Sequence, residues 1–262
     1  MGFTHHYLLI FALCILYVES ADPSAQLCNQ NSNTTTPQLT KNIDSLLSAL
    51  VKAASESGYS VTSSGSNQAR VYGLAQCRGD VPSDECSSCI QTAAKEIKNM
   101  CPDRVDARIW YEYCFIRYNT ENFFGQVDTG YGTFYYNVEN VTDPKTFNTA
   151  LGALMYKINS MASAAGNKGI AKDSTKLSDF LTLYALSQCT RDLSQLSCRQ
   201  CLAIAVGNFP TYCDDKKGCR VIYSSCYVRY ELYPFYFPLD ADQKMALESS
   251  LKKNYTSVVK KP

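Results

Sequence analysis

Apolar residues recur with helical spacing in two long segments, one in each half of the chain. In residues 37–57 the apolar face consists of Leu39, Ile43, Leu46, Leu47, Leu50 and Val51. In residues 143–164 the corresponding face consists of Phe147, Leu151, Leu154, Met155, Ile158 and Met161. Each segment opens on a proline that follows Thr36 or Asp143, which is a typical helix start. The pattern therefore predicts a long amphipathic helix near the start of each half.

Later segments of each half are typical of strands. Residues 69–77 and 180–189 are expected to be strands that lead into cysteine-rich stretches, and a second helix is expected to carry the C-x2-C pair to the next cysteine. Aromatic and β-branched residues then predict closing strands over 107–119 and 219–237. Two helices packed on an antiparallel sheet would make each half an α+β domain.

The cysteines repeat with a period of 112 residues. The motif C-x8-C-x2-C and two later cysteines occur twice, as Cys77, Cys86, Cys89, Cys101 and Cys114, and as Cys189, Cys198, Cys201, Cys213 and Cys226. Each half adds one unmatched cysteine, Cys28 or Cys219. Such a long period indicates tandem domains and not a solenoid. We expect domains over 21–133 and 134–245, followed by a basic, solvated tail over 246–262.

The N-terminus carries an apolar run, residues 7–18, that is too short to span a bilayer and is typical of a secretory signal. Small residues predict cleavage after Ser20, so we expect residues 1–20 to be removed. Without Cys14, twelve of the thirteen cysteines remain, and an even set in an exported protein indicates a disulfide framework. No second stretch approaches membrane-spanning length, so we expect extracellular release.

Composition restricts the chemistry further. The net charge of +1 gives no electrostatic footprint for nucleic acid. The two histidines, His5 and His6, lie inside the predicted signal, so the mature chain lacks the usual base for a serine or cysteine nucleophile. Export also disfavours zinc-binding C-x2-C pairs. A redox-active pair would need an oxidoreductase fold and free cysteines, whereas Cys86 and Cys89 have other cysteines to bond. We therefore expect no enzymatic activity, no metal and no cofactor. N-glycosylation sequons occur at Asn33, Asn140 and Asn254.

The doubled cysteine motif resembles the plant ginkbilobin-like (salt-stress/antifungal) domain. Two copies behind a signal, with no membrane span, resemble the cysteine-rich repeat secretory proteins. The residues alone leave the cysteine pairing open, whereas the resemblance implies a definite pattern and a sheet of five antiparallel strands with two helices in each domain. The implied disulfides are Cys28–Cys101, Cys77–Cys86, Cys89–Cys114, Cys189–Cys198, Cys201–Cys226 and Cys213–Cys219.

The resemblance also implies candidate sugar-binding residues, because the family's founding seed protein binds mannose and inhibits fungi. Its sugar is held by an Asn after the first cysteine, an Arg six residues before the last cysteine and a Glu five residues after it. These positions are Asn29, Arg108 and Asn119 in the first half, where an amide replaces the acid. In the second half they are Arg220 and Glu231, with no matched Asn. The alternative is that both arginines pair structurally with backbone groups or carboxylates beside the sheet.

Two functions follow from the resemblance. The first is a lectin-like, antifungal plant defence glycoprotein of the apoplast that binds a mannose-type glycan. The second is an apoplastic interaction module that partners receptor ectodomains or other cell-surface proteins, without sugar binding. The aromatic run at residues 230–237 is expected to pack in the core or between the domains, with a sugar-stacking or protein-docking surface as the alternative.

Overall fold

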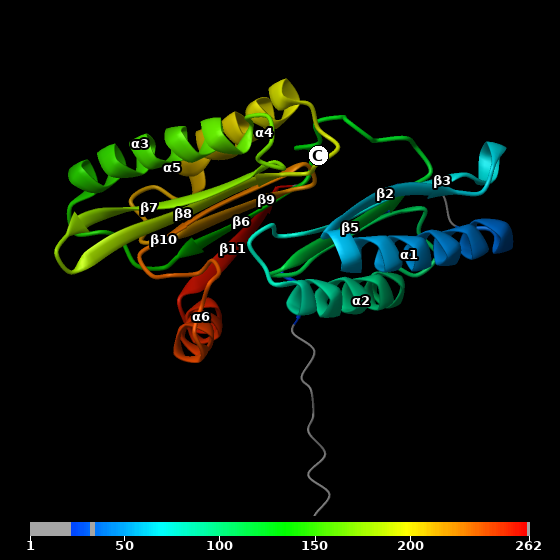
Figure 1. The fold of residues 1–262 in the computed structure, drawn as a ribbon, viewed down its shortest axis with the longest axis horizontal. Helices are drawn as coiled ribbons and strands as arrows, with labels where there is room; N and C mark the ends of the chain where they lie inside the picture. Colours follow the sequence, from blue (N-terminus) through cyan, green and yellow to red (C-terminus); the bar gives the residue numbers. More distant parts are fainter. Residues whose placement is uncertain (1–21, 32–34, 261–262) are drawn as a thin grey trace, which may run out of the picture.

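The computed structural model describes residues 22–31 and 35–260, and its chain forms two α+β domains, each with a pair of helices on the outer side of its sheet (Figure 1). The last helix of the described chain lies on the other face of the second sheet. The predicted signal, residues 1–20, and the sequon at Asn33 lie outside the described residues.

The first domain has the predicted two helices on a five-stranded antiparallel sheet. Its strands are ordered β1-β4-β5-β3-β2. Its elements are β1 (Ala25–Cys28), α1 (Pro37–Ser57), β2 (Tyr59–Ser64), β3 (Val71–Cys77), α2 (Ser83–Met100), β4 (Asp106–Trp110) and β5 (Cys114–Asn119). The Thr36 side chain caps α1, and the helix ends where Gly58 adopts a left-handed backbone with φ of 72°.

The second domain repeats this plan and adds a strand, in the order β11-β6-β9-β10-β8-β7. Residues 120–131 connect β5 to β6 and thus the two sheets. The elements are β6 (Gly132–Asn137), α3 (Pro144–Ala162), β7 (Ile170–Ser178), β8 (Leu181–Cys189), α4 (Gln195–Gly207), α5 (Phe209–Tyr212), β9 (Cys219–Tyr223), β10 (Cys226–Glu231), α6 (Ala241–Lys253) and β11 (Tyr255–Lys260).

The prediction of a solvated basic tail over 246–262 is wrong for its described part. The residues to 253 complete α6, and β11 pairs with β6 over six residues at the edge of the second sheet. Lys252 and Lys253 lie in the last turn of α6, where the helix dipole favours cations. These two lysines therefore end a helix, and Lys260 ends strand β11.

Three smaller expectations also fail. Met161 is 41% exposed, because Ala162, four residues after Ile158, takes the inward-facing position on the last turn of α3 and turns Met161 toward the side of the helix. The second helix of the second domain breaks at Asn208 into α4 and α5, where Pro210 cannot supply a backbone donor. Strand β10 ends at Glu231, so residues 232–237 form a loop rather than a strand.

Helices and sheets are joined by apolar packing and by six disulfides. In each domain the two helices cover one sheet face with a core of leucine, isoleucine, alanine and half-cystine side chains. The disulfides are Cys28–Cys101, Cys77–Cys86, Cys89–Cys114, Cys189–Cys198, Cys201–Cys226 and Cys213–Cys219.

The opposite sheet faces meet around an apolar cluster that includes Leu74, Trp110, Phe115 and Ile222. This contact is pseudo-symmetric. Gln76 donates its amide to the Cys189 carbonyl at 2.9 Å, and Gln188 donates to the Cys77 carbonyl at 2.9 Å. Gln188 lies 112 residues after Gln76, and Cys189 lies 112 residues after Cys77, so the two hydrogen bonds are repeat counterparts of each other. The two domains therefore contact each other as the subunits of a two-fold dimer do.

The pseudo-symmetry extends into the loops after each sheet. The Asp192 carboxylate accepts from the Gly125 backbone amide at 2.8 Å, and the Asp80 carboxylate accepts from the Phe237 amide at 2.8 Å. The run at 230–237 therefore packs between the domains through its loop.

We predict that Gln188→Ala lowers the free energy of unfolding by about 1–3 kcal/mol, because it leaves the buried Cys77 carbonyl and Gly79 amide without their partner. Urea unfolding monitored by tryptophan fluorescence measures the change. Gln200→Ala, at an exposed position of α4, is the control and should change stability by less than about 0.5 kcal/mol. Equal effects of the two variants would contradict the role given to Gln188.

Candidate functional site

The candidate sugar-binding residues of the first domain lie on the sheet face that looks away from the helices. Along β4, Ala107 and Ile109 pack into the helical core, so the alternating Asp106 and Arg108 project toward the second domain. Strand β5 ends at Asn119 directly opposite Asp106. The strand pleat therefore places Arg108 at the contact between domains.

Asp106 is the centre of this group. Its carboxylate accepts from the Asn29 amide at 2.9 Å and lies 3.5 Å from the Arg108 guanidinium. Asn29 and Asn119 are partly exposed, whereas Arg108 is only 8% exposed. Asp106 was not among the residues predicted from the sequence, although its position two residues before Arg108 on a predicted strand places both on one face.

Arg108 also bonds across the domain boundary. Its Nη1 donates to the Asp128 carboxylate and to the Ser224 hydroxyl, both at 2.7 Å. Asp128 lies in the connector between the sheets and also accepts from Arg117 at 3.1 Å. The structure thus gives Arg108 the carboxylate partners that the structural alternative requires.

The second domain does not bring Arg220 and Glu231 to the surface. Arg220 donates to Glu112 of the first domain at 2.5 Å and stacks over Tyr135. Glu231 is fully buried, where it accepts from Arg229 at 2.8 Å and from the Tyr255 hydroxyl. In this domain the positions implied by the resemblance hold the fold and the domain contact.

Glu112, in the turn between β4 and β5, is the main residue that the sequence analysis missed. Its carboxylate contacts Arg78 at 2.8 Å, Arg229 at 2.7 Å and Arg220 at 2.5 Å, with 19% of its side chain exposed. The repeat hides this role, because the counterpart of Glu112 is Ser224. The arginines that occur in both repeats, Arg108 with Arg220 and Arg117 with Arg229, were the sequence signal that buried acidic partners are required.

The pKa values of the two acids are shifted in opposite directions by the balance between burial and neighbouring charges. Burial alone would raise the pKa of Glu112, but Arg229, Arg220 and Arg78 hold it below its ordinary value. Burial raises the pKa of Glu231, and Arg229 and Tyr255 offset only part of the rise. Burial, together with the nearby Arg108, lowers the pKa of Arg117 to about 10.

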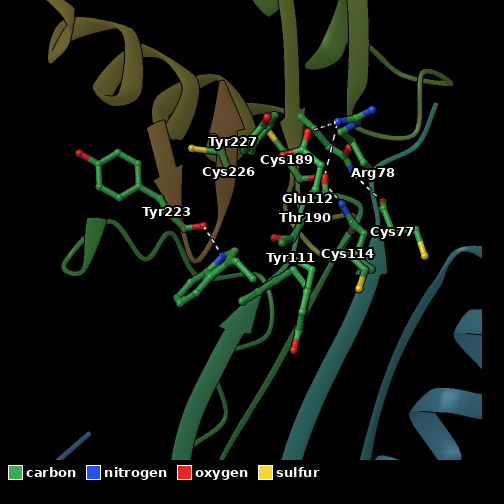
Figure 2. Close-up of a pocket in the computed structure, with 14 residues that line it drawn as sticks. Cys77, Arg78, Tyr111, Glu112, Cys114, Cys189, Thr190, Tyr223, Cys226 and Tyr227 are labelled. Atoms are coloured by element: carbon green, nitrogen blue, oxygen red, sulfur yellow. Dashed lines mark hydrogen bonds and ion pairs between the residues drawn. The ribbon is translucent and has the colours of Figure 1, made fainter. Parts of the chain in front are cut away.

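A small cavity of about 70 Å³ lies beside this network, between the sheets. Figure 2 shows Arg78 and Glu112 close together on its wall, with Tyr227 reaching it from β10. The Tyr227 hydroxyl has no partner within the described part of the chain. The volume suits a few ordered waters and is far below that of small-molecule sites.

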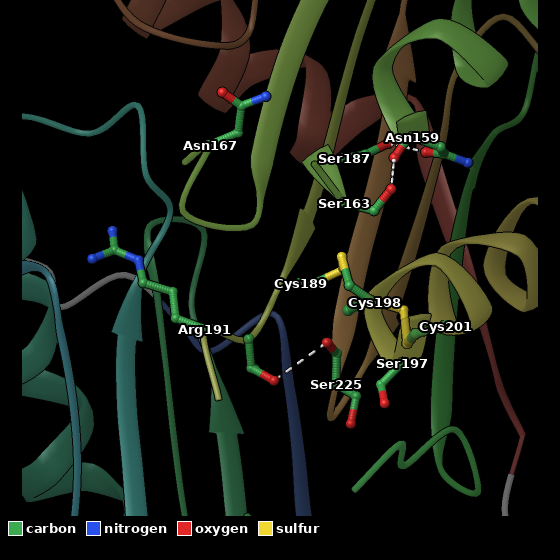
Figure 3. The surroundings of a disulfide bond; sticks show 12 residues. Asn159, Ser163, Asn167, Ser187, Cys189, Arg191, Ser197, Cys198, Cys201 and Ser225 are labelled. Carbon is green, nitrogen blue, oxygen red and sulfur yellow. Dashed lines mark hydrogen bonds between the residues drawn. A yellow bond between two sulfur atoms is a disulfide. The ribbon is translucent and has the colours of Figure 1, made fainter. Parts of the chain in front are cut away.

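The cysteines of the described residues offer no reactive sulfur, because all twelve form disulfides. Figure 3 shows Cys189 joined to Cys198 beside Cys201, which bonds Cys226. Over residues 22–31 and 35–260, no group of three or more His, Cys, Asp or Glu side chains could hold a metal. The same residues include no helix long and apolar enough to cross a membrane.

Two sequon asparagines lie in the described part. Asn140 is exposed, and its amide oxygen accepts from Lys216 at 2.7 Å. Asn254 is partly buried at the end of α6, where its carbonyl accepts from the Val138 amide. Asn140 is therefore the more accessible of the two.

Comparisons with known proteins agree with the repeat. A family model described as salt stress response/antifungal matches residues 27–121 and again residues 135–233. Cysteine-rich repeat secretory protein 55 of Arabidopsis thaliana is 56% identical, over 89% of this chain and 90% of that protein. An antimicrobial ginkbilobin-2-like protein of Castanea crenata is 40% identical, over 87% of this chain and 94% of that protein.

A solved structure has the same arrangement of two domains. The tandem DUF26 ectodomain of a cysteine-rich receptor-like protein from Arabidopsis thaliana superposes with a TM-score of 0.71 at 28% identity. The match covers 81% of this chain and 98% of that one.

We predict that Glu112→Gln lowers the free energy of unfolding at neutral pH by about 3–5 kcal/mol, because three arginines lose their shared charge partner. Since folding lowers the pKa of Glu112, its contribution is present at neutral pH and is lost as the pH falls through that lowered pKa. The free energy of unfolding of the variant should therefore fall less between neutral and acidic pH than that of the wild type.

Thermal unfolding from pH 7 to pH 2 measures both effects. The exposed Glu121→Gln is the matched control and should behave like the wild type. An unfolding free energy that is the same for Glu112→Gln and the wild type at pH 7 would refute the central role of Glu112.

Proposed function

Because the chain belongs to the salt stress response/antifungal family and contains that domain twice, we propose that it is a secreted plant defence protein that recognises an extracellular glycan without catalysis. The name of the relative cysteine-rich repeat secretory protein 55 supports secretion, and the family and fold predicted from the sequence are confirmed. The recognition of a mannose-type glycan is the proposal.

One observation carries the assignment of sugar binding to the first domain. Asn29 and Asn119 are partly exposed beside the buried Asp106, which accepts from Asn29, and side-chain amides supply both the donors and the acceptors that sugar hydroxyls need. In the second domain the counterpart of Asn119, Glu231, is fully buried. Arg108 would act as a positioning residue, because its guanidinium is held by Asp128 and Ser224.

A second candidate function is recognition of a cell-surface protein. The helices α3 and α4 expose apolar side chains on the outer side of the second domain, among them Tyr156 at 78% and Leu196 at 76%. Large exposed apolar residues are common at protein contact sites. The solved relative with the same domain pair is the ectodomain of a receptor-like protein.

Export and processing form part of the proposal. We place signal cleavage after Ser20 and glycosylation at Asn140 first among the three sequons. The predicted domain bounds of 21–133 and 134–245 need adjustment, because β6 of the second sheet begins at Gly132 and β11 extends that sheet to Lys260. The destination of such a product in a plant is the apoplast.

We predict that Asn29→Ala weakens binding to a mannose oligomer about tenfold, and that Asn119→Glu tightens it about fivefold, because a charged acceptor bonds a hydroxyl more strongly than an amide. A glycan array followed by calorimetry measures both. Asn148→Ala, on α3 of the second domain, is the control and should leave binding unchanged. Absence of wild-type binding to every glycan, with capture of a protein from the cell wall, would favour the second function.

A further inference from the structure

A second cavity, of about 360 Å³, lies between the two domains. Its walls include residues 55–58 at the end of α1, Gly79, residues 166–168 before β7, Ile170 at the start of β7, and Arg191 after β8. We call it the interdomain groove. Its volume falls within the range of small-molecule sites.

The groove is lined by both pseudo-symmetric domains, and its two sides differ at the matched positions Gly79 and Arg191. Gly79 and Arg191 are repeat counterparts, and their backbone amides donate to Gln188 and Gln76 at 3.0 and 2.9 Å. A Cβ on Gly79 would come within 3.1 Å of Ile170, so that side has no room for a long side chain. Since glycine makes the same backbone hydrogen bond at the matched position, the Arg191 side chain is not needed for the contact between the domains.

Arg191 is a cation without an acidic partner among the described residues. Figure 3 shows its side chain pointing away from the Cys189–Cys198 disulfide, toward the first domain. Its Nη1 donates to the Ser57 carbonyl at 3.3 Å, its guanidinium lies 5.7 Å from the Tyr59 ring centroid, and its Nε has no partner. The neighbouring Asp192 instead accepts from the Gly125 amide.

The deeply buried arginines differ from the half-buried Arg191, because they have carboxylate partners. Arg78, which also borders the groove, is neutralised by Asp80 and Glu112 at 2.7 and 2.8 Å. Because Arg191 is half-buried without such a carboxylate, burial lowers the pKa of its guanidinium. An unneutralised, partly desolvated guanidinium on a cavity wall favours an anionic ligand.

The rest of the lining combines one more cation with neutral polar groups. Lys168 lies on the wall formed by the second domain, and the one acid of the lining, Glu56, is exposed to solvent. Ser57 and Ser83 line the groove at exposed positions, whereas the hydroxyl of the third lining serine, Ser55, is buried without a partner within the described chain. Hydroxyl groups of this kind match the hydroxyls of a sugar.

We propose that the interdomain groove binds an acidic saccharide, with its carboxylate or sulfate on the Arg191 guanidinium and its hydroxyls on the serines. The site goes beyond the proposed mannose-type recognition, because it uses neither Asn29 nor Asn119. It also joins residues of both domains, so it exists only in the tandem chain.

The test is calorimetry on the full secreted chain with three probes: a galacturonate oligomer, its fully methyl-esterified form, and inorganic sulfate. The acidic oligomer should bind, and its neutral ester should bind at least tenfold more weakly. Arg191→Gln should weaken the acidic oligomer about tenfold or more, and Arg191→Lys should lose less because it keeps the charge. Arg199→Gln removes an exposed charge on α4, outside the groove, and should bind like the wild type.

Two results would overturn the proposal: equal binding of the acidic oligomer and its ester, or equal effects of Arg191→Gln and Arg199→Gln. Sulfate that binds as tightly as the oligomer would overturn the saccharide assignment, whereas weaker sulfate binding in competition with the oligomer supports it. Urea unfolding of each variant separates lost binding from lost folding. The comparison does not depend on mannose binding, so failure of the proposed function leaves it interpretable.

Discussion

Three guanidinium groups converge on one carboxylate between the domains, and the relative placement of the two sheets depends on that contact. Glu112 comes from the first domain, and Arg220 and Arg229 come from adjacent strands of the second. Buried charges cost much desolvation energy, so the network is a weak source of net stability. Any sliding of one sheet over the other would leave a charge unpaired, and the network therefore selects one arrangement of the domains.

Local features of the fold could be read from the sequence more fully than the contacts between repeats. Helix α1 spans the predicted residues 37–57, since its apolar spacing and its capping residue act within one segment. The role of Glu112 could not be read, because its partners lie in the other repeat and its own counterpart is Ser224. Asp128 lies in the connector, where no repeat pattern applies. The burial of Arg108 could not be predicted either, because it results from the contact between the two sheets, where Arg108 bonds Ser224.

The first strand of each domain is held in place by a different interaction. Strand β1 is a short edge strand, and Cys28 ties it to the end of α2 through Cys101. In the second domain the register places Tyr136 of β6 opposite Cys219, where the first domain has Cys28 opposite Ala107. That strand has no cysteine, but β11 pairs with its other edge. The helix and strand that end the chain lie beyond the matched family region, so the repeat could not predict them.

The contact between the sheets also sets an order of events during synthesis. The first domain can close its helical core and its three disulfides as soon as its own residues have been made. Its other sheet face, with Leu74, Trp110 and Phe115, stays uncovered until the strands of the second domain have emerged. Over that interval the nascent chain presents an apolar surface beside Glu112, which still lacks Arg220 and Arg229, and such a surface is a target for chaperones. The surface that fixes the arrangement of the domains in the folded protein is thus exposed, and open to non-native contacts, while the second domain is still being made.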